Sequence, residues 1–268
     1  MGETENLKAR GKLSMLMLAG MLAGCTMTPF SSDQPADGAV SQTAEVAEAA
    51  YSVGDYVEAA RLYERASEQH PSDVSSYIGL GKSYLAQSQY TRAESALNRA
   101  RQLQPRNPEV YNILGELALR RTQPAIALEH YSEALRRDPR NLRGFIGKAI
   151  SLDYLSRHAE AQPVYVEGLK HYPTNFALLN NRALSLVLAG RIGEGTVLLE
   201  ELLRDPDRGD TARANMAIAY ALDGRERDAA AILKGVMTPQ EISAALVQYR
   251  KLRSEYLAGK PIGYLAFQ

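Results

Sequence analysis

Few side chains in this sequence are of the types that perform catalysis or bind metal ions. There is one cysteine, Cys25, and the histidines are His70, His130, His158 and His171. A single cysteine cannot form a disulfide within the chain, a thiolate zinc site or an iron–sulfur cluster. No two histidines stand four residues apart, the spacing at which a helix presents two metal ligands. We therefore expect no enzyme activity, no metal and no cofactor.

Binding of phosphates or nucleic acid is not indicated either. The glycine-containing run at residues 79–82 falls inside a predicted helix, where its glycines serve packing. The chain has 31 basic and 31 acidic residues, so no overall positive charge attracts nucleic acid. Arg120 and Arg121 lie among acidic neighbours and are interpreted as part of a solvated face. We expect neither a nucleic-acid partner nor a small-molecule substrate.

The N-terminal residues have the organisation of a secretory signal. Lys8, Arg10 and Lys12 precede an apolar run at residues 13–22. At about 1.5 Å per residue, a helix of this length spans only half of a ~30 Å hydrocarbon core, so the run is too short for a stable transmembrane helix. A basic start, a short apolar run and small residues before a cleavage point are typical of an export signal.

The cysteine stands at the end of this signal, in the sequence LAGC at residues 22–25. This sequence resembles the lipobox of bacterial lipoproteins. The resemblance implies a signal peptide at residues 1–24, cleavage before Cys25, and acyl chains on the thiol and new amino group of Cys25. Buried methylenes contribute ~0.8 kcal/mol each, so such an anchor holds a protein on a membrane. By the same resemblance, Thr26 in place of aspartate favours the outer membrane, with the protein facing the periplasm.

Residues 25–42 are expected to form the lipidated cysteine and a flexible linker. The segment is rich in Ser, Thr, Pro, Asp and Gly and has no apolar periodicity. A segment of this composition cannot bury enough apolar surface to offset the entropy of ordering it. We expect it to connect the lipid to a folded body and to carry no chemistry of its own.

From residue 43 onward the sequence repeats with a period of 34 residues. Prolines recur at this spacing, and small and bulky residues keep the same register. The prolines are Pro71, Pro105, Pro139 and Pro173, one series of small residues is Ala47, Gly81, Gly115, Ala149, Ala183 and Ala217, and the bulky series is Tyr63, Leu97, Tyr131, Tyr165, Leu199 and Leu233. The pattern resembles the tetratricopeptide repeat, whose unit is a pair of antiparallel helices. It predicts an all-α solenoid, a right-handed superhelix of six units over residues 43–237.

Each series has a physical role in such a solenoid. Small residues let the paired helices approach closely, the bulky residue fills the layer between them, and proline ends the second helix. We expect aromatic residues near the start of the first helices, such as Tyr111 and Phe145, to pack on the preceding unit. In the turn within each pair, Gly54 can take a positive φ, whereas Ser88 and Thr122 are expected to cap the next helix.

A capping helix and a tail are predicted after the repeats, over residues 238–268. Thr238, Pro239 and Glu241 are the residues of a capping box with proline at the first helical position. Apolar residues then recur at spacings of three and four from Ile242 to Tyr256, which makes a stripe that can cover the open end of the stack. The last nine residues are too short and too mixed in character for an assignment.

The resemblance also implies a partner-binding groove on the concave face of the superhelix. In this repeat family the second, fifth, ninth, twelfth and thirteenth residues of each unit line that face. Carried onto this chain, the groove residues are Ile78, Asn112, Ile146, Ile150, Asp153, Tyr154, Asn180, Leu184, Leu188 and Ile218. Such a groove is mostly aliphatic and suits the apolar stripe of an amphipathic helix. The alternative for any one of these residues is that it belongs to the core between helices.

Three stretches support a closer resemblance, and they are residues 152–162, 180–190 and 212–220. They are similar to the TadD family, the tetratricopeptide-repeat lipoproteins of Flp pilus assembly in the tight-adherence secretion system. The resemblance implies a non-enzymatic, pilotin-like role at the outer membrane, in which the groove binds a secretin or another protein of that system.

Two other functions remain open on the sequence. One is a pilotin of another type IV pilus or a lipoprotein of outer-membrane barrel assembly, since such proteins are also built from these repeats. The other is an adaptor that recruits peptidoglycan hydrolases. A crosslinked pulldown of the lipidated protein distinguishes these partners.

Overall fold

The computed structural model describes residues 42–205, 207–263 and 267. All of them belong to one compact unit that spans residues 40–268. The predicted signal peptide and Cys25 lie outside the described residues, as does most of the predicted linker. No helix in the described part of the chain has both the length and the apolar character needed to cross a membrane.

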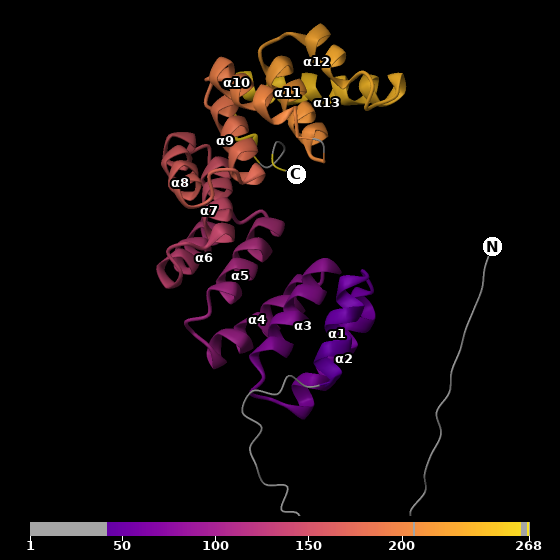
Figure 1. Ribbon diagram of the computed structural model, residues 1–268, viewed down its shortest axis with the longest axis vertical. Helices are drawn as coiled ribbons and strands as arrows, with labels where there is room; N and C mark the ends of the chain where they lie inside the picture. Colours follow the sequence, from indigo (N-terminus) through magenta and orange to yellow (C-terminus); the bar gives the residue numbers. More distant parts are fainter. Residues whose placement is uncertain (1–41, 206, 264–266, 268) are drawn as a thin grey trace, which may run out of the picture. The chain divides into compact units, whose positions relative to one another are not determined.

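The described residues form thirteen α-helices and no strand, which confirms the all-α prediction. The helices are α1 (Gln42–Ser52), α2 (Tyr56–Gln69), α3 (Val74–Ala86), α4 (Tyr90–Leu103), α5 (Pro108–Arg120), α6 (Pro124–Arg137), α7 (Leu142–Tyr154), α8 (His158–His171), α9 (Phe176–Leu188), α10 (Ile192–Leu202), α11 (Gly209–Leu222), α12 (Glu226–Leu233) and α13 (Pro239–Leu257). Each helix packs on the next one in sequence, so α1 to α12 make six stacked pairs (Figure 1).

The first helices of the pairs form a continuous inner layer. These inner helices are α1, α3, α5, α7, α9 and α11, and each contacts the inner helix of the next pair. The second helices, which we call the outer helices, lie on the other side of this layer, as α8 does beside α7 (Figure 1). The core is therefore built between successive pairs, and no pair could bury its apolar surface alone.

The bulky residues of the repeat fill the layer between the paired helices, as predicted, and can also reach the next pair. Tyr131 on the outer helix α6 is a clear case, because it lies between Gly115 of its own pair and Gly147 of the following pair. A Cβ atom placed on Gly115 would lie 2.8 Å from the Tyr131 ring, and one on Gly147 would lie 2.2 Å from it. Burial raises the pKa of the Tyr131 hydroxyl well above its usual range.

The aromatic residues of the inner helices contact the outer helix of their own pair as well as the preceding pair. Phe145 shares a cluster with Leu128 and Leu135 of α6, in the preceding pair, as expected. Phe145 stacks on His171 of α8 at 5.9 Å between ring centroids, and Arg137 of α6 lies 4.2 Å above the Tyr111 ring. The Tyr111 hydroxyl donates to the carbonyl oxygen of Pro105, in the loop before its own pair. These rings thus hold the two helices of one pair together.

The turns within the pairs use left-handed backbone, and of the residues in this series neither Ser88 nor Thr122 caps the next helix. Ser88 and Thr122 have φ of 59° and 58°, and Ser156 repeats the pattern at 58°. The helices that follow Ser88 and Thr122 begin after Gln89 and Gln123, neither of which forms a side-chain cap. The prediction that Ser and Thr cap these helices is therefore wrong, because they occupy the conformation that glycine takes in the other turns.

Side-chain caps begin four of the inner helices, and Asp55 also caps the outer helix α2. Asn107, Asn141 and Asn175 stand at the N-caps of α5, α7 and α9, and each side-chain oxygen accepts a backbone N–H of the first turn. Asp73 does the same for α3, with two backbone N–H groups. These polar residues follow the repeat prolines, so each junction between pairs ends one helix and starts the next.

Helix α13 closes the C-terminal end of the stack. The predicted capping box is present, since the Thr238 hydroxyl accepts from the Glu241 N–H at 3.3 Å and the Glu241 carboxylate accepts from the Thr238 N–H at 2.7 Å. Ile242, Leu246 and Tyr249 pack against the last pair, as the apolar stripe predicted. Past α13, Gly259 takes a φ of 69° and turns the chain back. The yellow trace that follows runs beside α9, on the side away from α8 (Figure 1).

Candidate functional site

The inner helices carry all ten residues that the sequence placed in the groove, but only some of them reach the surface. Ile146, Ile150, Tyr154 and Ile218 are partly exposed. The other six are buried among the helices: Ile78, Asn112, Asp153, Asn180, Leu184 and Leu188. The first four can therefore contact a partner directly, whereas the buried six shape the layer beneath. The alternative of an inter-helix core position applies to those six.

Asp153 is the most deeply buried charged residue of this layer. Its side chain is fully buried, and three side chains bind its carboxylate. Tyr165 donates to Oδ2 at 2.9 Å, Ser185 donates to Oδ1 at 2.7 Å, and Nδ1 of His158 lies 2.7 Å from Oδ1. Burial raises the pKa of the Asp153 carboxyl, and the bond with His158 counteracts part of that rise. The carboxylate joins α7, α8 and α9 and presents no free oxygen to a ligand.

This arrangement contains Ser, His and Asp but lacks the geometry of a nucleophilic triad. Ser185 donates to Asp153 rather than to His158, and its oxygen also accepts from the Gln162 amide at 2.9 Å. A nucleophile must instead be hydrogen-bonded to the histidine that takes its proton. The cluster is a cross-link between two repeats, a role for His158 and Asp153 that the sequence did not suggest.

Buried asparagines link other inner helices. The Asn112 amide donates to the side chain of Asn141 at 2.9 Å, and the Asn215 amide donates to that of Asn180 at 2.9 Å. The first bond joins α5 to the N-cap of α7, and the second joins α9 to α11. Asn112 Oδ1 is buried with no hydrogen-bond partner among the described residues. These predicted groove residues therefore fix the spacing of the inner helices.

The C-terminal half of the concave face is occupied by the chain itself. The occupant, which we call the tail, comprises residues 260–263 and Phe267. Ile262 is 3% exposed and packs in a cluster with Leu184 and Leu188 of α9 and Leu222 of α11. The Phe267 ring lies 6.4 Å from that of Tyr154 between centroids. No structure was assigned to this segment from the sequence, because a few apolar residues without a period do not indicate where they pack.

The N-terminal half of the same face holds a more polar recess of about 370 Å³. Its lining includes Tyr51 and Tyr56, the apolar Leu85 and Ile113, and the charged residues Lys82, Glu116, Arg120 and Arg143. Arg143 pairs with Glu116 at 3.1 Å, and Lys82 pairs with Glu109 at 2.5 Å. Arg120 lines this recess while its side chain stays exposed, in keeping with the interpretation as a solvated face. This half of the face is therefore more polar than the aliphatic groove that the sequence predicts.

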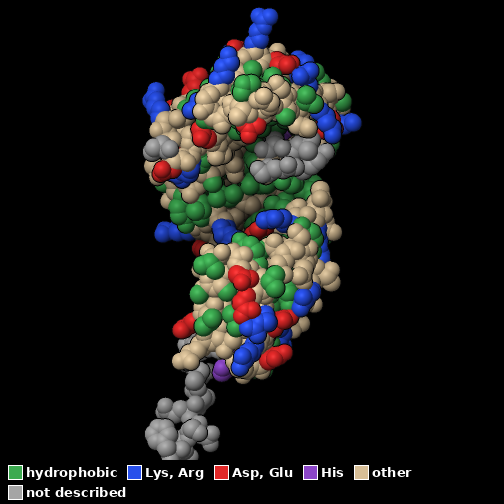
Figure 2. Space-filling view, turned by 90° about the vertical axis from the view of Figure 1, so that its right-hand side faces the viewer, with side chains coloured by type: hydrophobic (Ala, Val, Ile, Leu, Met, Phe, Trp, Pro, Cys, Tyr) green, Lys and Arg blue, Asp and Glu red, His purple; other side chains and the backbone are tan. Residues whose placement is uncertain are grey.

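The space-filling view of this side of the molecule is consistent with that division. Hydrophobic side chains gather in a band across the middle, and Lys and Arg side chains border the band (Figure 2). An extended surface with an apolar part and a charged part can bind a peptide or a helix by several contacts at once.

Comparison with known proteins supports the same architecture. Residues 50–117 match the sequence profile of the tetratricopeptide repeat. A tetratricopeptide-repeat protein from Parabacteroides merdae has 16% identity and a TM-score of 0.67, with 81% of this chain and 88% of that one covered. The fold is a tetratricopeptide-repeat solenoid. Solenoids of this kind form extended concave surfaces suited to binding, so the concave face is the candidate binding surface.

Two further solved structures have this solenoid fold. PilW, described as a widely conserved type IV pilus biogenesis factor, has 17% identity and a TM-score of 0.59, covering 80% of this chain and 92% of its own. YrrB, described as a tetratricopeptide-repeat protein with an unusual peptide-binding site, has 18% identity and a TM-score of 0.50, covering 63% and 88%. A search of curated proteins found no match. At identities this low, the similarity to these structures shows a shared fold.

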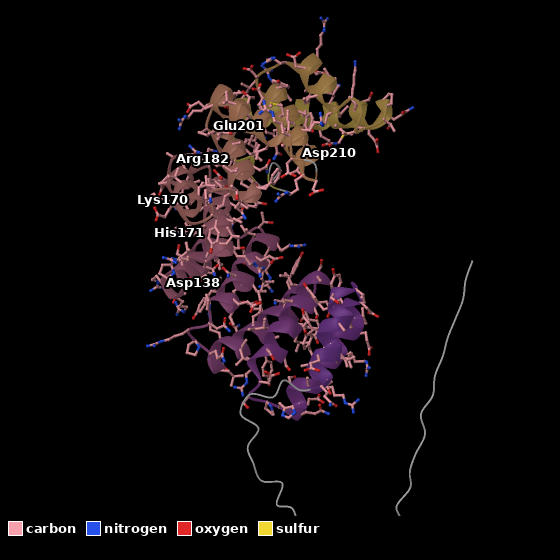
Figure 3. The ribbon with its side chains drawn as sticks, viewed as in Figure 1. Asp138, Lys170, His171, Arg182, Glu201 and Asp210 are labelled. Carbon is pink, nitrogen blue, oxygen red and sulfur yellow. The ribbon has the colours of Figure 1, made fainter. Side chains whose placement is uncertain are left out.

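His171 lies on an outer helix, apart from this face. His171 and Lys170 stand in the last turn of α8, on the same side of the view as Asp138 at the end of α6 (Figure 3). Lys170 pairs with Glu167 at 2.7 Å, while His171 stacks on Phe145. In the part of the chain that the structure describes, no three His, Cys, Asp or Glu side chains gather as metal ligands.

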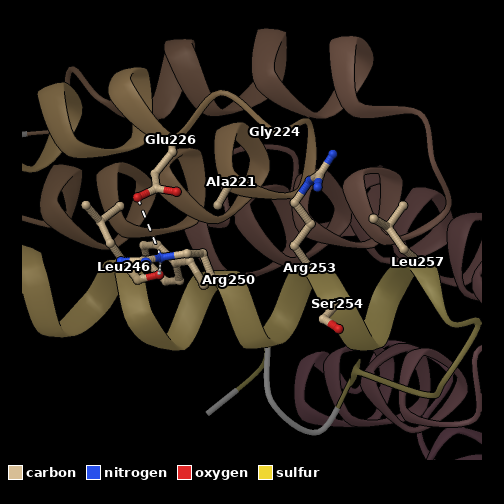
Figure 4. Close-up of a pocket in the computed structure, with 9 residues that line it drawn as sticks. Ala221, Gly224, Glu226, Leu246, Arg250, Arg253, Ser254 and Leu257 are labelled. Atoms are coloured by element: carbon tan, nitrogen blue, oxygen red, sulfur yellow. Dashed lines mark hydrogen bonds and ion pairs between the residues drawn. The ribbon is translucent and has the colours of Figure 1, made fainter.

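A second recess of the solenoid, about 440 Å³, lies against the capping helix (Figure 4). It is bounded by the turn between α11 and α12 and by α13. Arg250 of α13 pairs with Glu226 of α12 at 3.6 Å, and Arg253 donates to the carbonyl oxygen of Leu222 at 3.3 Å. These contacts attach the cap to the last pair, so the recess is the seam between cap and stack.

Proposed function

We propose that this protein is an outer-membrane lipoprotein scaffold for Flp pilus assembly, which acts as a pilotin for a secretin. The observation that carries the proposal is the combination of a lipobox-like sequence at Cys25 with a tetratricopeptide-repeat solenoid. The first supplies an attachment to the membrane, and the second supplies a surface for a partner. The resemblance of three stretches to the TadD family suggests that the membrane attachment and the partner surface serve the tight-adherence secretion system.

The physical advantage of this design is local concentration. A lipid anchor confines the solenoid to the membrane in which the channel assembles, so binding to a partner there becomes effectively intramolecular. The concave face needs only modest intrinsic affinity under those conditions. Partly exposed Ile146, Ile150 and Ile218 offer apolar contacts for a partner segment, and Lys82, Arg120 and Arg143 offer charged ones.

The test is a deletion strain complemented with variants of the full chain. We expect deletion to reduce heat- and detergent-resistant secretin multimers and surface Flp pili, measured by immunoblot and electron microscopy. Cys25→Ser, which removes the acylated thiol, should behave as the deletion does. Thr26→Asp should redirect the protein to the inner membrane and lose function, whereas Thr26→Ser should retain it.

Normal secretin multimers and normal pili in the deletion strain would refute the pilotin role. A crosslinked pulldown of the lipidated protein then identifies the alternative. Recovery of a secretin from another type IV pilus or of a barrel-assembly protein indicates the first alternative, and recovery of peptidoglycan hydrolases indicates the second.

A further inference from the structure

The tail packs on the inner helices as a bound peptide would. Its described residues Ile262, Gly263 and Phe267 each make a different kind of contact. Ile262 is buried to 3% exposure among aliphatic side chains of α9 and α11, in the cluster that also contains Leu252 of α13. An isoleucine buried in this way contributes roughly 1.5–3 kcal/mol relative to an exposed one. This single residue is therefore the main apolar anchor of the tail.

Gly263 follows the anchor at a point where the tail backbone touches that of α7. A Cβ atom on residue 263 would lie 2.5 Å from the carbonyl oxygen of Asp153 and 2.9 Å from Cα of Tyr154. Real side chains do not approach backbone atoms so closely, so the contact requires glycine. The N–H of Phe267 donates to the carbonyl oxygen of Gly263 at 3.1 Å, which brings the Phe267 ring back towards Tyr154.

The cap keeps attachments of its own when the tail leaves this position. Helix α13 has its own attachments to the last pair, through the apolar residues Ile242, Leu246 and Tyr249. The tail starts after Gly259, whose φ of 69° is a conformation that glycine adopts and leaves readily. Detachment of the tail uncovers Leu252 and Tyr256 of α13, while the attachment of α13 through Ile242, Leu246 and Tyr249 remains.

We propose that the C-terminal half of the concave face is a binding site for a segment with an aliphatic residue, a glycine directly after it, and an aromatic residue four positions after the glycine. The tail fills this site in the free protein, and a partner segment of the same chemistry displaces it. The inference rests on the proposed scaffold function and deepens it, because it states which part of the face the partner uses and what the partner must carry.

The occupied site makes binding conditional. A segment tethered by a short flexible connection has an effective concentration on the order of millimolar. A free peptide of the same sequence must compete with the tail. Its apparent association constant for the intact chain is therefore the intrinsic constant multiplied by the fraction of time that the site is open. Weak or incidental apolar peptides are thereby excluded, and a partner held close by the membrane is favoured.

The test uses a fluorescein-labelled synthetic peptide with the sequence of residues 260–268 and measures its fluorescence anisotropy. The proteins are the full chain in detergent and the same chain ending at Lys260. We expect the shortened chain to bind the peptide and the full chain to bind it at least about tenfold more weakly. A peptide with Gly263→Val should bind neither protein, and Ile218→Arg in the shortened chain should abolish binding of the unmodified peptide.

A second variant covers the case in which the shortened chain does not fold. Gly263→Val in the full chain leaves the tail attached but dislodges it, so this variant should bind the peptide as the shortened chain does. If neither variant binds the peptide while at least one retains a native circular dichroism spectrum, the proposal is overturned and the tail is only part of the core.

The oligomeric state is checked by light scattering on the same samples. A monomeric full chain is expected, whereas a dimer that the shortened chain cannot form would show that the tail binds a second copy instead, and would overturn the proposal. The peptide-binding assay contains no secretin. Its outcome is therefore independent of the deletion-strain test, and either proposal can fail without the other.

Discussion

Gly263 and Asp153 meet backbone to backbone, and a Cβ atom on Gly263 would lie 2.5 Å from the Asp153 carbonyl oxygen. Gly263→Ala should therefore loosen the tail, because the added methyl group cannot be accommodated without moving the tail away from α7. We expect faster amide deuterium exchange in the C-terminal residues, measured by mass spectrometry, with little change in exchange along α1 to α6.

The matched control for that experiment is Gly193→Ala. Gly193 lies near the start of α10, and a Cβ there would meet no atom within 4 Å. Exchange in the tail should stay as in the parent chain. If Gly263→Ala also leaves the exchange of the tail unchanged, the close contact with Asp153 does not hold the tail in solution.

The buried carboxylate of Asp153 should be critical to stability. Asp153→Ala removes the partner of Tyr165, Ser185 and His158 together, and each buried donor left without an acceptor costs roughly 1–3 kcal/mol. We expect a loss of about 3–4 kcal/mol in the free energy of unfolding, measured in urea. Asp223→Ala, at an exposed aspartate that ends α11, should change it by less than about 0.5 kcal/mol.

The same residue predicts a pH dependence. Burial raises the pKa of Asp153 in the folded chain above its ordinary value near 4, so the folded state holds this proton more tightly than the unfolded state does. The contribution of Asp153 to stability is thus greatest below about pH 4 and declines as the pH rises through the folded pKa. The Asp153→Asn variant has no titratable group at this position, so it serves as the reference.

The free energy of unfolding of the parent chain relative to Asp153→Asn should therefore fall between pH 4 and pH 7. Urea titrations at several pH values measure it. A difference that is constant or that rises with pH would mean that the pairing with His158 dominates over burial, contrary to this prediction.

The repeat could be predicted from sequence because its signals are local and repeated. A small residue and a bulky residue recur at a fixed spacing in six units, and a proline recurs at the same spacing in four, so the same constraint is repeated along the chain. The tail and the Asp153 cluster carry no such redundancy. Ser185 lies 32 residues from Asp153, and Ile262 lies further still from the helices it packs on, so nothing in the sequence near either residue indicates the contact. The groove positions were placed on the correct helices, yet burial of Leu184 and Asn180 depends on neighbouring pairs and on the tail.

The close fit between Gly147 and Tyr131 predicts strong coupling between them. Alanine normally stabilises a helix interior by about 1 kcal/mol relative to glycine, but here its methyl group would lie 2.2 Å from the Tyr131 ring. We expect Gly147→Ala to destabilise the chain by about 1–3 kcal/mol, since overpacking outweighs helix propensity.

In a Tyr131→Leu background the ring is gone, so Gly147→Ala should be neutral or stabilising by up to about 1 kcal/mol. The double-mutant cycle, measured by urea unfolding, should give a coupling energy above about 1 kcal/mol. Additive effects would show that the ring moves aside freely and that the repeat does not depend on this fit.

Thr122 should be the most unfavourable residue of the turns within the pairs. It has a φ of 58°, and a β-branched side chain is poorly tolerated in left-handed backbone, where it costs on the order of 1–2 kcal/mol. Glycine adopts this conformation freely but loses more entropy on folding. We expect Thr122→Gly to stabilise the chain by about 0.5–1 kcal/mol, measured by urea unfolding.

Thr196→Gly, in the interior of α10, should instead destabilise it by a similar amount, because there glycine only weakens a helix. Destabilisation by Thr122→Gly would indicate that the threonine side chain makes contacts that outweigh the strain of its backbone.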